Sequence, residues 1–99
     1  MARFDVYANA NVPGYLLDVQ ADLLRGLNTR VVVPLLPLNV APLPAARLNP
    51  SFEIQGVAVS MVTQFMAAVP ETELKRQVAN LDGERDAILE AVDFLHQGW

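Results

Sequence analysis

The segment RVVVPLL, residues 30–36, decides which fold the 99-residue chain is expected to adopt. Its run of valines favours a strand, because side chains branched at Cβ fit a pleated sheet better than a helix. Pro34 has no amide hydrogen, so the strand has to bend, bulge or lie at a sheet edge there. The segment therefore predicts an apolar strand with one irregular position.

Two more strands are expected before this segment. Residues 2–8 alternate in character, with Phe4 and Val6 on one face and a second face that meets solvent. Residues 9–14 (NANVPG) form a polar loop, and residues 15–19 (YLLDV) form the returning strand. Together they predict a hairpin with a long tip.

The middle of the chain combines a loop with further strands. Prolines recur through residues 37–50, which predicts an ordered, extended loop and excludes a helix. Residues 52–59 predict a tight hairpin, in which Gly56 supplies the positive φ that such a turn needs. Another strand is expected over residues 61–66, closed by residues 67–70.

The last part of the chain has the pattern of a helix over residues 82–97. Asp82 suits the N-cap, and Gly98 suits the position just after the helix. An apolar stripe at helical spacing is formed by Ile88, Leu89, Val92 and Leu95. Strands followed by one terminal helix predict a single domain, residues 1–99, that is mostly β with one C-terminal α-helix.

Composition restricts the class of protein. The chain is 53% hydrophobic and 18% charged, which excludes a disordered chain and leaves more apolar surface than one small domain can bury, so we expect a homodimer. A net charge of −4 disfavours independent binding to nucleic acid. The chain has neither cysteine nor a signal-peptide pattern nor an apolar run of membrane-spanning length. A cytoplasmic protein with no membrane contact is expected.

Residues that could carry catalysis are isolated from one another. His96, the single histidine, suits either a general base or, more simply, a helix-terminal cap. Asp18 and Asp22 have the spacing of paired carboxylates or metal ligands, but local hydrogen bonding at a strand end is the favoured interpretation. Since no phosphate loop or zinc motif is found, we expect no enzyme activity, no catalytic residue, no metal and no cofactor.

Trp99 is the only tryptophan and the last residue in the sequence, directly after Gly98. Tryptophan is the residue most enriched among the energetically dominant contacts of protein interfaces. Either the indole folds back onto its own domain, or it anchors another macromolecule. The residues alone leave both interpretations open.

Several motifs occur together in the order and spacing of one family. They are Phe4-Asp5-Val6-Tyr7, Asp18-Val19-Gln20-Ala21-Asp22-Leu23-Leu24, Arg30-Val31-Val32-Val33-Pro34-Leu35, Met66-Ala67-Ala68-Val69-Pro70, Val78-Ala79-Asn80-Leu81 and the terminal Gly98-Trp99. Over nearly its whole length the chain resembles the CcdB toxins of type II toxin–antitoxin modules. The Asp-Val-Gln-x-Asp and Arg-x-Val-x-Pro-Leu motifs are fairly specific as a pair.

The resemblance implies a fold and a function. The implied fold is an SH3-like β-barrel with a small accessory sheet and a C-terminal helix, assembled as a homodimer. The implied function is a non-enzymatic poison that binds the A subunit of DNA gyrase and traps the gyrase–DNA cleavage complex. A CcdA-like antitoxin removes the toxin with a disordered tail. The two repress their own operon, so the toxin meets DNA only indirectly, through the antitoxin.

The resemblance also implies two binding surfaces. The gyrase-binding surface would comprise Leu23, Asp93, Gln97, Gly98 and Trp99, with Phe4 and Tyr7 beneath or beside it. The antitoxin-binding surface would comprise Asn9, Ala10, Asn11, Val12, Pro13, Gly14 and Tyr15. The chain departs from the family in two places: the tip loop is two residues shorter than in the best-known member, and Gln97-Gly98-Trp99 replaces the family's Trp-Gly-Ile ending.

Two alternative functions remain at this stage. The same barrel class includes MazF-like endoribonucleases, in which Arg30 and Thr29 would act on a scissile phosphate. An acidic chain with one lysine and scattered arginines argues against that function. The other alternative is a CcdB-like relative that is not toxic.

Overall fold

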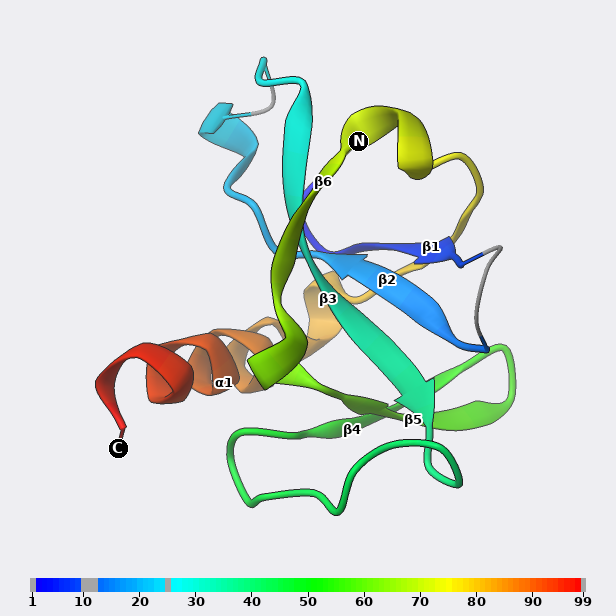
Figure 1. Ribbon diagram of the computed structural model, residues 1–99, viewed down its shortest axis with the longest axis vertical. Helices are drawn as coiled ribbons and strands as arrows, with labels where there is room; N and C mark the ends of the chain where they lie inside the picture. The colour runs from blue at the N-terminus through cyan, green and yellow to red at the C-terminus, as the bar shows by residue number, and fades with distance from the viewer. Residues whose placement is uncertain (1, 10–12, 25, 99) are drawn as a thin grey trace.

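The computed structural model describes residues 2–9, 13–24 and 26–98 and is drawn in Figure 1. Its strands are β1 (Asp5–Ala8), β2 (Tyr15–Asp18), β3 (Thr29–Pro37), β4 (Ser51–Ile54), β5 (Val57–Met61), β6 (Ala67–Pro70) and β7 (Gln77–Asn80). Its helices are the 3₁₀ turns η1 (Asp22–Leu24), η2 (Thr63–Phe65), η3 (Glu71–Glu73) and η4 (Asp82–Glu84), and the α-helix α1 (Arg85–Gln97). The fold is mostly β: a curled antiparallel sheet forms a half-barrel, and a C-terminal helix packs on it, as the sequence predicted.

Strand β3 organises the sheet, which has the order β4-β5-β3-β2-β1-β7. One edge of β3 pairs with β2, where Val33 lies opposite Leu17. The other edge is shared, since β6 pairs with residues 29–32 of β3 and β5 pairs with residues 35–37. The sheet therefore branches along β3: β6 pairs with its first half, and the β4–β5 hairpin extends the sheet from its second half (Figure 1).

Pro34 lies at the point where β3 changes partner. The Pro34 carbonyl accepts a hydrogen bond from the Val62 amide, 2.9 Å, on the side that β5 and β6 share. The N and C=O of one strand residue point to the same side, so the proline nitrogen faces the gap between these two strands. The missing amide hydrogen therefore costs no bond in the sheet, which explains why an interior strand tolerates proline.

Apolar side chains are buried on both faces of the sheet. The larger cluster lies between the sheet and α1 and comprises Phe4, Val6, Leu17, Val19, Val33, Leu35, Phe52, Ile54, Val59, Met61, Ile88 and Ala91. A smaller cluster of Tyr7, Val32 and Leu74 lies apart from it. The prediction of a solvated second face on the first strand is therefore wrong, because Asp5 and Tyr7 are also buried.

Local signals located the turns correctly. The β4–β5 hairpin turns at Gln55 and Gly56, and both have positive φ, +52° and +81°. Two successive positive φ values are the mark of a type I′ turn. At the end of α1, Gly98 has φ +77° and donates its amide hydrogen to the Phe94 carbonyl, 2.8 Å. The predicted roles of Gly56 and Gly98 are thus confirmed.

Three details differ from prediction. The strand expected over residues 61–66 does not form: Met61 is the last residue of β5, and the chain then turns into η2. Side chains of Asn49 and Thr63 donate hydrogen bonds to backbone carbonyls at this turn. Strands β6 and β7 were not predicted. Asp82 is not the N-cap of α1: it begins the 3₁₀ turn that leads into the helix, and its carboxylate pairs with Arg85 at 2.8 Å.

We predict that Gly14→Ala destabilises the fold. Gly14 has φ +109°, and a Cβ there would lie 2.3 Å from the Leu35 carbonyl oxygen, so strand β3 has to shift. The free energy of unfolding should fall by more than about 1 kcal/mol in urea titrations. Gly83→Ala is the matched control, since a Cβ there meets nothing within 4 Å. An unchanged urea midpoint for Gly14→Ala would contradict this geometry.

Candidate functional site

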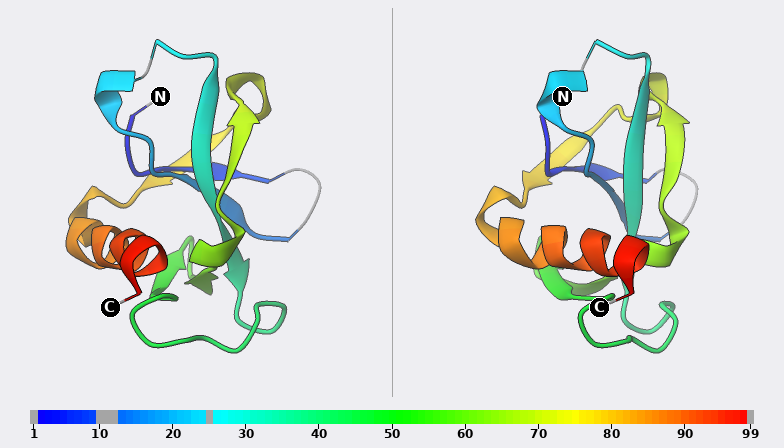
Figure 2. Two further views of the ribbon diagram at one scale, coloured as in Figure 1. Left: turned by 60° about the vertical axis from the view of Figure 1, so that its left-hand side comes forward. Right: turned by 90° about the vertical axis from the view of Figure 1, so that its left-hand side faces the viewer.

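The exposed residues of the predicted gyrase surface come from two elements, η1 and α1. Leu23 is 94% exposed in η1, and Asp93 and Gln97 are exposed on α1, with Gly98 directly after it. Figure 2 (right) shows both elements on the side facing the viewer, with η1 near one end of the molecule and the end of α1 near the other. The two groups therefore share a side of the chain without touching, and Trp99 lies outside the described residues.

Phe4 lies beneath this side and joins three segments. Its amide donates to the Asp18 carbonyl, 2.7 Å, and its carbonyl accepts from the Leu81 amide, 2.9 Å. Its buried ring lies 5.1 Å from the guanidinium carbon of Arg3 and 5.2 Å from that of Arg85, both cation–π distances. Phe4 also has φ +71°, a conformation that costs a non-glycine residue free energy and persists only where surrounding contacts fix it.

Hydrogen bonds from the N-terminal segment and from β2's end hold η1 in place. The Arg3 amide donates to Asp22 Oδ1, 2.7 Å, and the side-chain amide of Gln20 donates to the Leu24 carbonyl, 3.0 Å. The same Gln20 side chain accepts a hydrogen bond from the Val31 amide, 3.1 Å. Because these bonds hold the Asp22 side chain and the Leu24 carbonyl, on either side of Leu23, the Leu23 side chain is presented to solvent from an anchored turn.

A buried ion pair lies under η1. Asp18 and Arg30 are both 0% exposed, and Asp18 Oδ2 lies 2.8 Å from Nε and 2.7 Å from Nη2 of Arg30. The other terminal nitrogen, Nη1, has no hydrogen-bond partner among the described residues. Burial raises the pKa of the Asp18 carboxyl above its usual value, while the Gln20 amide and the Arg30 guanidinium oppose that rise.

This ion pair decides between the interpretations offered for Asp18, Asp22 and Arg30. Asp18 Oδ1 accepts from the Gln20 amide, 3.0 Å, whereas Asp22 bonds the Arg3 amide, so the two carboxylates serve the backbone separately. Arg30 has no solvent-exposed surface on which to receive an RNA phosphate. The burial of Arg30 thus counts against the ribonuclease alternative, which placed Arg30 together with Thr29 at the phosphate.

A second group of polar contacts surrounds Asp5 on β1, close enough to Asp18 for the two carboxyl groups to interact electrostatically. Asp5 accepts hydrogen bonds from the Gln77 and Asn80 side chains, both 2.9 Å, and from the Ala2 amide, 2.8 Å. The Tyr7 hydroxyl also donates to Asp5, 3.3 Å. Burial, together with the nearby carboxylate charge, raises the pKa of Tyr7 to about 12. Tyr7 therefore supports the strand from beneath and presents almost no surface.

The second half of α1 is braced by the loop between β3 and β4. Arg47 pairs with Glu90 at 2.8 Å, and its guanidinium carbon lies 5.1 Å from the centre of the Phe94 ring. His96 Nδ1 lies 2.9 Å from the Val92 carbonyl within the last turn, in accord with a helix-terminal role. The sequence did not predict the contact of Arg47 with α1, because 43 residues separate it from Glu90.

The predicted antitoxin loop borders an apolar cleft. Asn9 and Pro13 line a cleft of about 360 Å³ together with Pro34, Leu36, Val40 and Phe65. The hydroxyl of Tyr15, on the neighbouring strand, donates to the Gln55 side chain, 3.3 Å, and Gly14 packs against β3. Ala10, Asn11 and Val12 lie outside the described residues. Sequence reasoning missed Leu36, Val40 and Phe65, which come from elements distant in the chain.

Metal ligation and membrane crossing each require a recognisable arrangement of residues. Within residues 2–9, 13–24 and 26–98, no three His, Cys, Asp or Glu side chains gather as a metal site would require. Over the same ranges, no helix combines the length and apolar character needed to cross a membrane.

Comparison with known proteins identifies one family. The family model described as "CcdB protein" matches residues 3–98, almost the whole chain. A comparison with curated proteins finds no match. The matched region includes η1, α1 and the buried Asp18–Arg30 pair.

We predict that breaking the buried pair is far costlier than replacing it. Asp18→Asn should lower the free energy of unfolding by about 3–5 kcal/mol, because it leaves the Arg30 charge buried without a counter-ion. The double variant Asp18→Leu, Arg30→Met should recover most of that loss in chemical denaturation. Equal stability of Asp18→Asn and wild type would show that the two charges do not depend on each other.

The raised pKa of Tyr7 predicts a loss of stability in alkali. Below about pH 10 the phenol is protonated in both folded and unfolded chains, whereas between about pH 10 and 12 only the unfolded chain loses its proton. The free energy of unfolding should therefore fall through this window in wild type and fall less in Tyr7→Phe. A difference between the two proteins that stays constant from about pH 9 to about pH 11 would contradict the prediction.

Proposed function

Since the chain belongs to the CcdB family and is therefore a toxin of a toxin–antitoxin system, we propose that it binds the A subunit of DNA gyrase and traps the gyrase–DNA cleavage complex. The observation that carries the proposal is the exposure of Leu23 on an anchored turn, on the same side of the molecule as the end of α1. Leu24 and Leu27 in the same segment are also about half exposed, and a group of exposed apolar side chains is typical of a binding surface. No covalent chemistry is required of the toxin.

A homodimer is proposed as the active form. Leu24, Phe65 and Leu95 leave apolar surface exposed, and the backbone edge of β6 opposite β3 is unpaired among the described strands. Burial of such surface between two copies is a common reason for dimer formation, and a two-fold dimer presents each binding residue twice. Two linked contacts on a symmetric target bind more tightly than one contact.

A CcdA-like antitoxin is proposed to occupy the apolar cleft beside Asn9 and Pro13. Exposed side chains of Val40 and Phe65 form its far wall, so an apolar side chain of a disordered antitoxin segment would gain buried area there. The net charge of −4 fits a toxin that leaves DNA contacts in operon autorepression to the antitoxin. We also propose that this toxin acts in the cytoplasm, where gyrase and its DNA are found.

We predict that Leu23→Ser weakens binding to the purified A subunit of gyrase by about tenfold or more, measured by calorimetry, and relieves growth arrest on expression. Leu43→Ser is the matched control, because Leu43 is also 94% exposed but belongs to the loop between β3 and β4. Both variants should keep the wild-type unfolding curve, since neither side chain is buried. Equal weakening of gyrase binding by the two substitutions, or no gyrase binding by the wild-type protein, would refute the proposal. A wild-type protein that neither binds gyrase nor arrests growth would be a non-toxic relative.

A further inference from the structure

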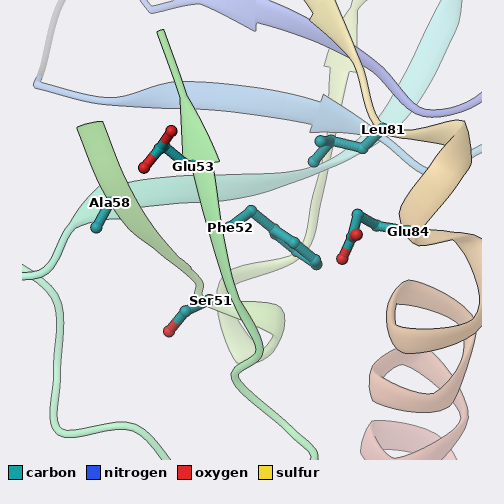
Figure 3. A pocket seen from close by; sticks show the side chains of 6 residues that line it. All are labelled: Ser51, Phe52, Glu53, Ala58, Leu81 and Glu84. Atoms are coloured by element: carbon teal, nitrogen blue, oxygen red, sulfur yellow. The ribbon is translucent and has the colours of Figure 1, made fainter. Parts of the chain in front are cut away.

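A cleft outside both proposed surfaces lies along the outer edge of β4. It has a volume of about 550 Å³ and is lined by Ser51, Phe52, Glu53, Ala58, Leu81 and Glu84 (Figure 3). One wall is the β4–β5 hairpin, and the other is the connection from β7 into η4. Clefts of this size are common binding sites, and the backbone and charges of this one restrict what it can bind.

The backbone of β4 offers unused hydrogen-bonding groups to this cleft. The Met61 amide donates to the Pro50 carbonyl, 2.9 Å, so the hydrogen-bonded pairs of the hairpin fall at residues 50, 52 and 54 of this strand. The N–H and C=O groups of Ser51 and Glu53 therefore point away from β5. Among the described strands, none pairs with β4 on that side.

The side chains of the cleft combine an apolar floor with an acidic rim. Phe52, 7% exposed, and Leu81 supply the floor, and Figure 3 shows Glu53 and Glu84 on opposite sides of the Phe52 ring. Within the described part of the chain, neither carboxylate has an ion-pair partner. The cation nearest in sequence, Arg85, is already held by Asp82. Two negative charges at the rim are thus left uncompensated.

We propose that this cleft binds an extended, basic peptide segment of another protein, which adds to the sheet as a strand beside β4. The peptide backbone would pair with Ser51 and Glu53, as in other cases of strand addition. Successive side chains of a strand point to opposite faces. Lysine or arginine on one face would meet Glu53, and side chains on the other face would cover Phe52 and reach Glu84. The inference is independent of gyrase binding.

Charge favours a basic peptide over a second copy of this chain. If two β4 strands paired antiparallel about a two-fold axis, the Glu53 side chains of the two copies would approach each other, and like charges in such positions are destabilising. The same charge protects the edge against self-association while the peptide is absent. A cationic strand replaces that repulsion by attraction.

The test uses ¹⁵N-labelled full-length chain and a peptide of about eight residues in which lysine and valine alternate. We expect amide shifts at Ser51 and Glu53, slower hydrogen exchange at both, and binding that weakens with salt. A peptide with glutamate in place of lysine should not bind. A lysine–valine peptide N-methylated on the edge-facing amides should bind at least about tenfold more weakly, because it cannot pair with the strand.

Variants separate charge from backbone pairing. The double variant Glu53→Gln, Glu84→Gln removes both rim charges and should weaken binding several-fold. The control variant Glu73→Gln removes one charge on η3 and should leave peptide binding unchanged. Glu53→Pro removes an amide hydrogen that β5 does not use and should abolish binding with the fold intact; if it unfolds, the N-methylated peptide decides. The proposal is overturned if the amide shifts at Ser51 and Glu53 are absent at millimolar lysine–valine peptide, or if the lysine and glutamate peptides bind equally. It is also overturned if the same shifts arise when the protein is concentrated without peptide.

Discussion

A charge buried away from water has to be compensated, and in this protein the Asp18–Arg30 pair meets that requirement at the centre of the sheet. The pair joins the end of β2 to the start of β3, where the β2–β3 pairing begins. Gln20 connects this ion pair to the surface turn, because it forms hydrogen bonds with Asp18, with the backbone of β3 and with the end of η1. The exposed turn that carries Leu23 is therefore linked by hydrogen bonds to the buried Asp18–Arg30 pair.

Specific contacts also hold the other elements that carry exposed residues. Phe4 holds the N-terminal segment against the start of α1, and Arg47 braces the second half of that helix. The molecule has three separate surfaces with exposed residues. They are η1 with the end of α1, the cleft beside Asn9 and Pro13, and the edge of β4. The proposals for a target, an antitoxin and a further partner therefore use three different surfaces.

Sequence reasoning predicted the features that local chemistry determines. The valines of β3, the positive φ of Gly56 and the helix end at Gly98 are properties of a few adjacent residues. Strands β6 and β7 were missed because they become strands only through pairing with β3 and β1, far away in the chain. The burial of Asp5 was missed for the same reason, since its partners Gln77 and Asn80 lie 72 and 75 residues away. For the candidate site, the sequence supplied the residue identities through the family motifs, but exposure of Leu23 and burial of Tyr7 depend on the folded chain.

The central claim is that buried polar contacts position η1 and α1 for gyrase. Amide hydrogen exchange of the protein, measured alone and with the purified A subunit of gyrase, tests it most directly. The account predicts slower exchange in residues 20–24 and 93–98 when gyrase is present, with residues 51–58 unchanged. Exchange that is unaltered in both of the first two segments, or slowed only in residues 51–58, would contradict it.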